Sequence, residues 1–400
     1  MNFTLPRAGD AGKISKTLSY YAAFIVLGLI TGVFGPTLPD LAQNTHTALN
    51  QISAIFAARS FGYLIGSWLA GHGYDRLPGH PLFAAALAVT ALTFALIPVL
   101  PLLGLLIGVL LVLGMAEGAI DVGGNSLLVW VHGERVGPFM NGLHFFFGVG
   151  AFLAPLVIAQ LTLATGEFRW AYWVLAALVA PVAFVFVRLP SPPIQHAAHQ
   201  THPTPTNPLL VALIAALLFV YVGAETGYGN WIFTYATQLN LANATDAALL
   251  TSTFWGAFTL GRLLGVVISH RAKPATIILL DLAGSLICVA IVALLPRSLP
   301  ALWVGTLGAG LFMASIFPTA IALAGQRLTL TASITGWFLI GAGMGAMAFP
   351  WLIGQLLEPA GAAILIPIVL VSLVLDLGLL GGITIVAQRR TRRQSREPSE

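Results

Sequence analysis

The stretches "GVGAFLAPLVIAQL" at 148–161 and "GMGAMAFPWLIGQL" at 343–356 repeat each other at a constant offset of 195 residues, with seven identities in fourteen positions. A second repeat has an offset of 203 and pairs Arg59, Gly62 and Ile65 with Arg262, Gly265 and Ile268. Self-similarity at a fixed spacing indicates that a chain contains repeated structural units. We therefore expect two related halves that fold in the same way.

The composition indicates the solvent in which these halves fold. Apolar residues make up 58% of the 400 residues, charged residues make up only 8%, and the mean hydropathy is +0.90. Soluble domains contain about 25% charged residues. One helical crossing of a bilayer core about 30 Å thick takes about 20 apolar residues, so about twelve crossings with short loops use up the chain. We predict a polytopic membrane protein.

Twelve stretches are long and apolar enough to span a bilayer, six in each half. Those of the first half lie at 19–42, 52–74, 81–99, 102–131, 138–164 and 169–189. Those of the second half lie at 208–236, 246–270, 274–296, 299–325, 329–357 and 361–387. In lipid the backbone must satisfy its own hydrogen bonds, which favours helices throughout. The predicted fold class is an all-α membrane protein with twelve transmembrane helices in two pseudo-symmetric six-helix bundles.

The domain boundaries follow from composition. We predict an N-terminal bundle at 1–189, a cytoplasmic linker at 190–207, a C-terminal bundle at 208–387 and a basic cytoplasmic tail at 388–400. The linker belongs to the Pro-rich stretch "RLPSPPIQHAAHQTHPTPTNP" at 188–208. Its residues His196, His199 and His202 have a metal-like spacing, but the composition favours a solvated linker over a metal site.

Positive charge predicts the orientation in the membrane. With both termini in the cytoplasm, fourteen of the eighteen Lys and Arg residues lie inside, Arg169 and Arg297 lie outside, and Arg59 and Arg262 lie within helices. Orientation thus accounts for the net charge of +4, and no nucleic-acid partner is expected. Membrane lipid is an expected partner of the protein; the basic tail could touch anionic lipid, but a role as a topological anchor is the favoured reading. The short loops favour a bacterial inner membrane.

Several kinds of chemistry find no support in the sequence. The single cysteine, Cys288, cannot form a disulfide within the chain. There is no motif for a nucleophile with its base, a phosphate-binding loop or a metal cage. We therefore predict that the chain is not an enzyme and that it has no cofactor and no metal site.

A polar ladder interrupts the fourth predicted helix. In "GMAEGAIDVGGNSLLVW" at 114–130, the residues Glu117, Asp121 and Asn125 are four apart, which places them on one helical stripe about 6 Å from rung to rung. A charged side chain that faces lipid costs at least about 2.5 to 3.5 kcal/mol. The ladder is therefore expected to face a wet cavity or a cation.

Three roles are open for the two carboxyls of this ladder. Glu117 or Asp121 could carry a coupling proton, because desolvation lets a carboxyl bind and release a proton at working pH. The pair could instead supply hard oxygen ligands to a coupling sodium ion. A third reading is a fixed internal ion pair with Arg59 or Arg262 that holds helices together.

The two-times-six layout resembles the major facilitator superfamily. "GYDRLPGH" at 73–80 resembles that family's loop between helices two and three, with Pro78 as an extra residue. Four further stretches resemble the fucose/galactose/glucose symporter branch, and most closely sodium-dependent glucose transporter-like proteins. These are "GPTLPDL" at 35–41, "DVGGN" at 121–125, "LHFFFGVGAFLAPL" at 143–156 and "YVGAETGYGNWIFTYA" at 221–236.

The resemblance implies a secondary active transporter that works as a monomer and moves a hexose-like solute by alternating access, coupled to H+ or Na+. Fucose permease-like proteins carry an acid followed four residues later by Asn in helix four, and Asp121 with Asn125 matches that pattern. Their second acid, in helix one, corresponds here to Gly35. Asp121 and Glu117 are thus the expected coupling-ion residues, and Asn125 is an expected substrate-binding residue.

Sugar recognition requires paired donors and acceptors for hydroxyls and an aromatic face for the ring. The other expected substrate-binding residues are Asn141, His144 and Phe145 in helix five and Glu225, Tyr228, Asn230 and Trp231 in helix seven. The glycines at 223, 227 and 229 would let helix seven unwind near the midplane. Two alternatives remain open: Asn141 and His144 could bond neighbouring helices, and Tyr228 and Trp231 could form an interfacial belt.

Arg59 and Arg262 are expected to act as gating residues on helices two and eight, pairing with carboxyls such as Asp75 or Glu134. Asp75, Arg76 and Arg135 belong to the same predicted inner network by position. Gating pairs that break and re-form suit alternating access.

Two other functions compete with sugar transport. One is an efflux antiporter of amphipathic small molecules on the same fold, and the other is a membrane sensor that does not transport. A polar midplane favours sugar transport over efflux.

Overall fold

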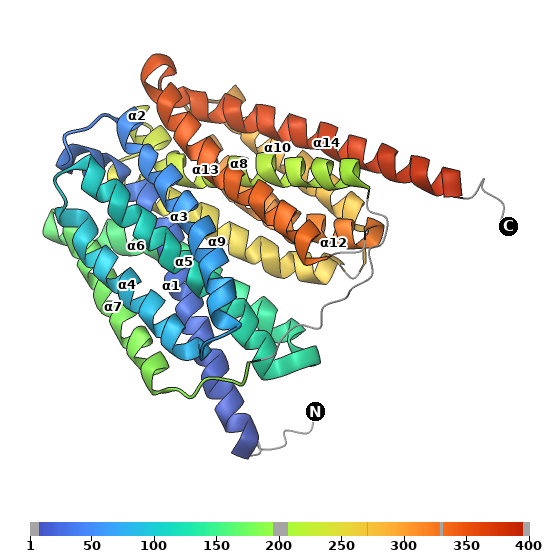
Figure 1. Ribbon diagram of the computed structural model, residues 1–400. Coiled ribbons are helices and arrows are strands. Elements are labelled where there is room, and N and C mark those ends of the chain that lie inside the picture. Colours follow the sequence, from blue (N-terminus) through green and yellow to red (C-terminus); the bar gives the residue numbers. More distant parts are fainter. Residues whose placement is uncertain (1–7, 195–206, 270, 329–330, 395–400) are drawn as a thin grey trace, which may run out of the picture. The chain divides into compact units, whose positions relative to one another are not determined.

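The computed structural model describes residues 8–194, 207–269, 271–328 and 331–394, and every regular element in these ranges is a helix (Figure 1). By length and composition, twelve helical segments of the described residues could cross a membrane, and some of them contain two consecutive helices. The all-α membrane fold class is therefore confirmed. The chain divides into two compact units, with the boundary between 198 and 199, inside the predicted linker. The histidine run of that linker, His196, His199 and His202, lies outside the described residues.

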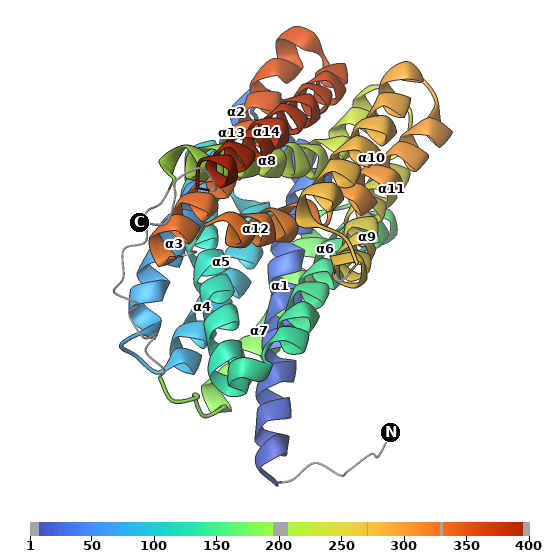
Figure 2. The same cartoon turned by 90° about the vertical axis from the view of Figure 1, so that its right-hand side faces the viewer.

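The first unit contains seven α-helices and two short 3-10 helices in its described residues. These are α1 (Ala8–Asn44), α2 (Leu49–Ile52), α3 (Ala54–Tyr74), α4 (Gly79–Leu96), η1 (Ile97–Val99), α5 (Leu103–His132), η2 (Gly133–Arg135), α6 (Gly137–Thr165) and α7 (Arg169–Arg188). Helix α1 packs along α6, α3 along α5, and α4 along α7. Figure 2 shows α1 and α6 side by side.

The second unit repeats this arrangement. Its elements in the described residues are α8 (Pro208–Gln238), α9 (Ala244–Ser269), α10 (Pro274–Leu294), α11 (Leu299–Met313), α12 (Ile316–Arg327), α13 (Ala332–Ala360), η3 (Ala362–Ile364) and α14 (Leu365–Gln394). Here α8 packs along α13, α9 along α11, and α10 along α14. In both units the first span pairs with the fifth, the second with the fourth, and the third with the sixth. The internal repeat in the sequence is thus a repeat of helix pairing.

The repeated glycines lie where the first and fifth spans of each unit cross. A side chain at Gly150 of α6 would meet the Ile25 carbonyl and Gly28 of α1. A side chain at Gly345 of α13, exactly one repeat later, would meet the Phe219 carbonyl and the backbone nitrogen of Gly223 in α8. Small residues at these positions let two helix backbones approach closely.

The tenth predicted span, 299–325, is divided in the structure. Helix α11 ends at Met313 and α12 begins at Ile316, with a turn at Ala314 and Ser315. Pro318 explains the break, because it has no N–H to donate to the carbonyl of Ala314 four residues earlier and its ring crowds that carbonyl.

Two helix ends also differ from the prediction. Helix α1 begins at Ala8 instead of residue 19, and α14 continues to Gln394, into the predicted tail at 388–400. Figure 1 shows α14 as one long, continuous ribbon. An apolar window predicts where lipid surrounds a helix, whereas the hydrogen-bond ladder continues into polar sequence until a helix breaker stops it. At 37 residues, α1 is about 55 Å long, well beyond a bilayer core of about 30 Å.

Candidate functional site

The polar ladder of α5 faces α3, because glycines bring these two helices together. Side chains at Gly114 and Gly118 of α5 would collide with the backbone of α3 at Arg59 and Tyr63. On α3, a side chain at Gly62 would collide in the same way with the α5 backbone at Leu111. The absence of these side chains lets the polar groups of the two helices reach each other directly.

The first rung is an ion pair between Arg59 and Glu117. The Nε of Arg59 donates to Oε2 of Glu117 at 2.8 Å, and its second guanidinium nitrogen donates to Oε1 at 2.6 Å. The two side chains are only 14% and 11% exposed. The guanidinium carbon of Arg59 also lies 5.4 Å from the ring centroid of Phe34 in α1. Two-point contact in a partly desolvated site makes this a strong interaction.

The second rung contains Asp121, whose two oxygens accept from neutral donors. The hydroxyl of Tyr63 donates to Oδ2 at 2.5 Å, and the Nδ2 of Asn125 donates to Oδ1 at 2.9 Å. The same amide nitrogen also donates to the backbone carbonyl of Asp121 at 2.9 Å. Asp121 and Asn125 are half-buried. The amide of Asn125 is therefore held against the carboxyl that precedes it by one turn.

The two rungs share one register. Arg59 and Glu117 are 58 residues apart in sequence, and so are Tyr63 and Asp121. Because the offset is the same for both pairs, α3 and α5 run in the same direction. Successive pairs are four residues apart on each helix, so they lie on one face of α3 and one face of α5.

Phe24 of α1 connects this ladder to the predicted residues of α6. Its ring occupies the place where a side chain at Gly124 of α5 would be, next to Asn125. Phe24 also meets the ring of His144 edge to face, with 5.8 Å between centroids. Phe145 makes an edge contact with Phe146 at 5.5 Å, and Asn141 is exposed. The ring of Phe24 therefore contacts both α5, at Gly124, and α6, at His144.

Glu225 and Arg262 of the second unit are near enough to interact electrostatically. The carboxyl of Glu225 on α8 lies in the field of the Arg262 guanidinium on α9 and is hydrogen-bonded to Tyr221 one turn earlier. Glu225 is only 8% exposed, and the guanidinium of Arg262 lies 4.6 Å from the ring centroid of Phe258. Arg262 is the repeat partner of Arg59, but its acid comes from the first span of its unit, whereas that of Arg59 comes from the fourth.

The other predicted residues of α8 bond to their own unit. The hydroxyl of Tyr228 is hydrogen-bonded to Thr306 at 2.8 Å, and the indole N–H of Trp231 donates to the carbonyl of Pro350 at 2.8 Å. The amide of Asn230 donates to the Thr226 carbonyl at 2.8 Å. Tyr228 and Trp231 are fully buried, so the alternative of an interfacial belt is wrong for both.

The expectation that the seventh helix unwinds is also wrong. Helix α8 is continuous from Pro208 to Gln238. Its three glycines provide space for neighbouring side chains, since side chains at Gly223, Gly227 and Gly229 would meet Phe349, Ile353 and Trp255. A glycine that receives a packed ring needs no change of backbone conformation.

The predicted gating residues other than Arg59 and Arg262 lie at helix ends. Asp75 is the exposed C-cap of α3 and Arg76 follows it, while Arg135 is exposed in η2. The structure pairs Arg59 with Glu117 on the neighbouring helix, whereas Asp75 lies four turns away along α3. Asp75 is thus too far along the same helix to be the partner of Arg59 in this arrangement.

Tyr63 is the site residue that sequence reasoning missed. The sequence contains a pattern that could have identified it, because Tyr63 follows Arg59 by four residues just as Asp121 follows Glu117. Only the parallel register of α3 and α5 shows that these two patterns face each other. Among the described residues, no three His, Cys, Asp or Glu side chains form a group that could hold a metal ion.

Comparison with protein-family models matches residues 20–350 to the Major Facilitator Superfamily. The chain is 32% identical to Sodium-dependent glucose transporter 1A of Mus musculus over 377 residues, which cover 84% of this chain and 88% of that protein. It is also 32% identical to Sodium-dependent glucose transporter 1 of Danio rerio over 390 residues, 88% of this chain and 66% of that protein. This chain therefore spans slightly less than two thirds of the Danio rerio protein.

Solved structures share the fold at low sequence identity. A crystal structure of a variant of the nucleoside transporter NupG has a TM-score of 0.76 at 15% identity and covers 94% of this chain and 99% of that chain. A bacterial homolog of the human lysosomal transporter Spinster has a TM-score of 0.71 at 13% identity, covering 96% and 98%. The relatives named as transporters confirm that this is not an enzyme. By its family match over residues 20–350 and its relatives at 32% identity, the chain belongs to the Major Facilitator Superfamily of membrane transporters.

Proposed function

We propose that this protein is a secondary active transporter that moves a hexose-like sugar by alternating access and couples its movement to H+ or Na+ at Asp121. The observation that carries the sugar assignment is the 32% identity, over 84% and 88% of this chain, to two proteins named as sodium-dependent glucose transporters. The polar ladder on α5 supplies the chemistry for coupling. The sugar and the ion are tested separately below.

Between the two carboxyls of the ladder, the geometry favours Asp121 as the coupling group. Glu117 accepts two charged hydrogen bonds from Arg59, at 2.6 and 2.8 Å. Asp121 accepts hydrogen bonds from the neutral groups of Tyr63 and Asn125, which can reorient when a cation binds. Glu117 then acts as the fixed counter-ion of Arg59.

Sugar binding is proposed to use groups close to Asp121. Asn125 lies one turn from the coupling carboxyl, and Asn141, His144 and Phe145 follow on α6 beyond Phe24. An amide and an imidazole offer donors and acceptors to sugar hydroxyls, and Phe145 offers a ring face. In the second unit, Glu225 and Asn230 are the polar candidates of α8, while Tyr228 and Trp231 hold that helix against α11 and α13.

The distribution of Lys and Arg supports further parts of the proposal. It favours both termini in the cytoplasm. The short loops are typical of a bacterial inner membrane, and two units within one chain suit a monomer.

The test is counterflow of labelled glucose into proteoliposomes preloaded with glucose, galactose, fucose or no sugar, with and without sodium and at two pH values. Accumulation with a preloaded hexose supports sugar transport. No counterflow with any sugar, from protein that elutes as a folded species, overturns it and favours efflux of another solute. Binding of a sugar without counterflow would indicate a sensor.

The coupling assignment is tested with Asp121→Asn, which keeps the size of the side chain and removes its charge. We expect gradient-driven uptake to be lost while exchange of sugar survives. Thr90→Val is a matched control, because Thr90 is buried in α4 and bonds only within its own helix. Unchanged gradient-driven uptake in Asp121→Asn would place the coupling ion elsewhere.

A further inference from the structure

A carboxyl group is fully buried in the second unit, on the packed face of α14. The side chain of Asp376 is 0% exposed, whereas the two residues before it, Val374 and Leu375, are exposed. Leu373 and Leu380, which lie on the same stripe of the helix as Asp376, are buried. Helix α14 packs against α8 and α10 of its own unit. Asp376 therefore lies within the helix packing and not on the outward face of α14.

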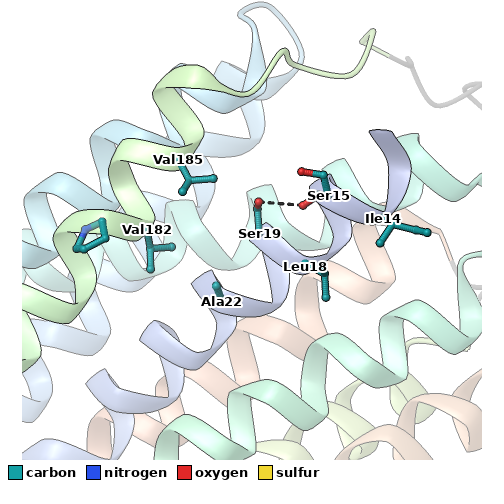
Figure 3. Close-up of a pocket in the computed structure, with 8 residues that line it drawn as sticks. Ile14, Ser15, Leu18, Ser19, Ala22, Val182 and Val185 are labelled. Atoms are coloured by element: carbon teal, nitrogen blue, oxygen red, sulfur yellow. Dashed lines mark hydrogen bonds between the residues drawn. The ribbon is translucent and has the colours of Figure 1, made fainter. Parts of the chain in front are cut away.

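Neither oxygen of Asp376 has a hydrogen-bond partner in the described part of the chain. Hydroxyl groups in apolar surroundings solve this problem by donating to the carbonyl one turn earlier, as Ser372 of α14 donates to Ile368 at 2.7 Å. Figure 3 shows the same kind of bond, from Ser19 to Ser15, in an apolar groove between α1 and α7. An ionised carboxylate has no proton to donate, so its own helix offers it no such partner. Only the protonated form of Asp376 can bond in this way.

The helices packed against α14 supply no positive charge to Asp376. Helices α8 and α10 contain no Lys, Arg or His, and the arginines of α14 itself begin only at residue 389. The titratable side chains of the two neighbouring helices are Tyr221, Glu225, Tyr228, Tyr235, Asp281 and Cys288. Tyr221, Tyr228 and Asp281 form hydrogen bonds to α11 or to the turn after it. Glu225 is hydrogen-bonded to Tyr221, Cys288 packs against Gly308 of α11, and Tyr235 lies in the last turn of α8.

A carboxylate that is removed from water without a positive partner or a hydrogen-bond donor is strongly disfavoured, and such a group takes up a proton instead. We propose that Asp376 is a proton-binding site of the second unit, which holds its proton while α14 packs against α8 and α10 and releases it when this packing opens to water. In water the side chain of aspartic acid is ionised at neutral pH. The packed arrangement thus binds one proton more than the open one, so acidic conditions favour packing. This site does not depend on which solute the protein transports.

The experiment compares infrared spectra of the full chain and of Asp376→Asn in phosphatidylcholine liposomes at neutral pH. A protonated carboxyl has a C=O stretching band that is separate from the bands of carboxylates. We expect the difference spectrum to contain one acid band and no carboxylate band. A carboxylate band in its place would show that Asp376 is ionised and would overturn the proposal. If Asp376→Asn fails to fold, Asp376→Leu, which suits the apolar surroundings, is measured instead.

Asp121→Asn is the matched control, because it removes a carboxyl of the first unit. The acid band that is lost in Asp376→Asn should remain in Asp121→Asn. Loss of the same band in both variants would assign it to coupled groups and would overturn a separate site at Asp376.

Exchange of the proton tests its link to helix packing. In D2O the acid band shifts when deuterium replaces the proton, and the rate of this shift reports how often the site opens. Leu380→Ala removes a buried side chain one turn after Asp376 and should raise the rate at least about ten-fold, because lost core contacts weaken the packed arrangement. Leu375→Ala, at an exposed position of the same helix, should leave the rate unchanged. Equal rates in the parent and in Leu380→Ala would overturn the link between the proton and the packing.

Discussion

At the scale of single residues, the two carboxyls of the α5 ladder differ in what holds them. Glu117 accepts two charged hydrogen bonds from Arg59 in a site that is little exposed. Asp121, one turn later, accepts from a phenol and an amide. Removing a partner of the first group leaves a desolvated charge, whereas removing a partner of the second leaves the carboxylate more open to a cation. Stability and coupling are therefore expected to respond to different substitutions.

Glu117→Gln is expected to destabilise the protein by about 3 to 5 kcal/mol, because it leaves the guanidinium of Arg59 without its carboxylate in a desolvated site. The measurement is the fraction of folded protein after heating in detergent, followed by size-exclusion chromatography. The double variant Arg59→Met with Glu117→Leu removes both charges and should recover most of the lost stability. A Glu117→Gln protein as stable as the parent would contradict this account of the pair.

Tyr63→Phe is expected to strengthen binding of the coupling cation. The phenol of Tyr63 competes with the cation for Oδ2 of Asp121, and a hydrogen bond to a charged group contributes about 1.5 kcal/mol, so the half-saturating cation concentration should fall about ten-fold. Gradient-driven uptake measured against pH and sodium concentration gives this value. Tyr74→Phe is the matched control, since the hydroxyl of Tyr74 donates to the Ala119 carbonyl and not to the ladder. An identical shift in both variants would rule out a specific role for Tyr63.

At the scale of elements, close helix crossings at glycine fix which faces meet. Gly62 of α3 and Gly114 of α5 hold those two helices in the register that aligns the rungs. Gly150 and Gly345 occupy equivalent crossings in the two units. At such a crossing the neighbour is backbone, which cannot move aside as the end of a flexible side chain can. Helix packing at these positions should therefore be intolerant of any side chain.

Gly345→Ala tests this intolerance on α13. Its new methyl group would collide with the Phe219 carbonyl, and overpacking of this kind costs about 1 to 3 kcal/mol. Gly336→Ala on the same helix is the control, because nothing lies within 4 Å of its new methyl group. The control should be neutral or slightly stabilising, since alanine favours a helix over glycine by about 1 kcal/mol. The measurement is the thermal stability of each variant in detergent. Equal effects at both positions would contradict the claim that the helix contact at Gly345 tolerates no side chain.

At the scale of the whole molecule, the two units repeat the same pairing of spans but not the same placement of charge. Each unit holds a half-buried arginine at the repeated position of its second span, Arg59 in one and Arg262 in the other. Arg59 is paired with an acid of the fourth span, whereas Arg262 acts electrostatically on an acid of the first span of its unit. Duplication thus preserved helix packing, which depends on small residues, while the polar groups diverged.

The orientation of the whole chain is tested with single cysteines. Cys288 is first changed to serine, since it is the only native cysteine. Arg297→Cys and Arg135→Cys then place one thiol in the loop between α10 and α11 and one in η2. In intact cells a membrane-impermeant thiol reagent should label the first and not the second, because the Lys and Arg distribution favours both termini in the cytoplasm. The opposite pattern would invert the proposed topology.

Much of this architecture could be predicted from the sequence, because the bilayer imposes strong rules on composition. The apolar content, the length of each span and the repeats at 195 and 203 residues were sufficient for twelve helices in two related halves. Spacing by four residues also placed Glu117, Asp121 and Asn125 on one stripe. These features are local, since periodicity and length depend only on neighbours along the chain.

Only the tertiary structure decided which groups meet across helices. The sequence alone could not assign Glu117 to Arg59 or Asp121 to Tyr63, because that assignment requires the parallel register of α3 and α5. Nor could it distinguish a glycine that loosens a helix from one that receives a neighbouring ring, as Gly223 receives Phe349 in the continuous helix α8. The physical reason is the same in each case. Hydropathy and helical period specify what surrounds a helix and which side chains share a face, whereas partner and register depend on how closely two separate backbones approach.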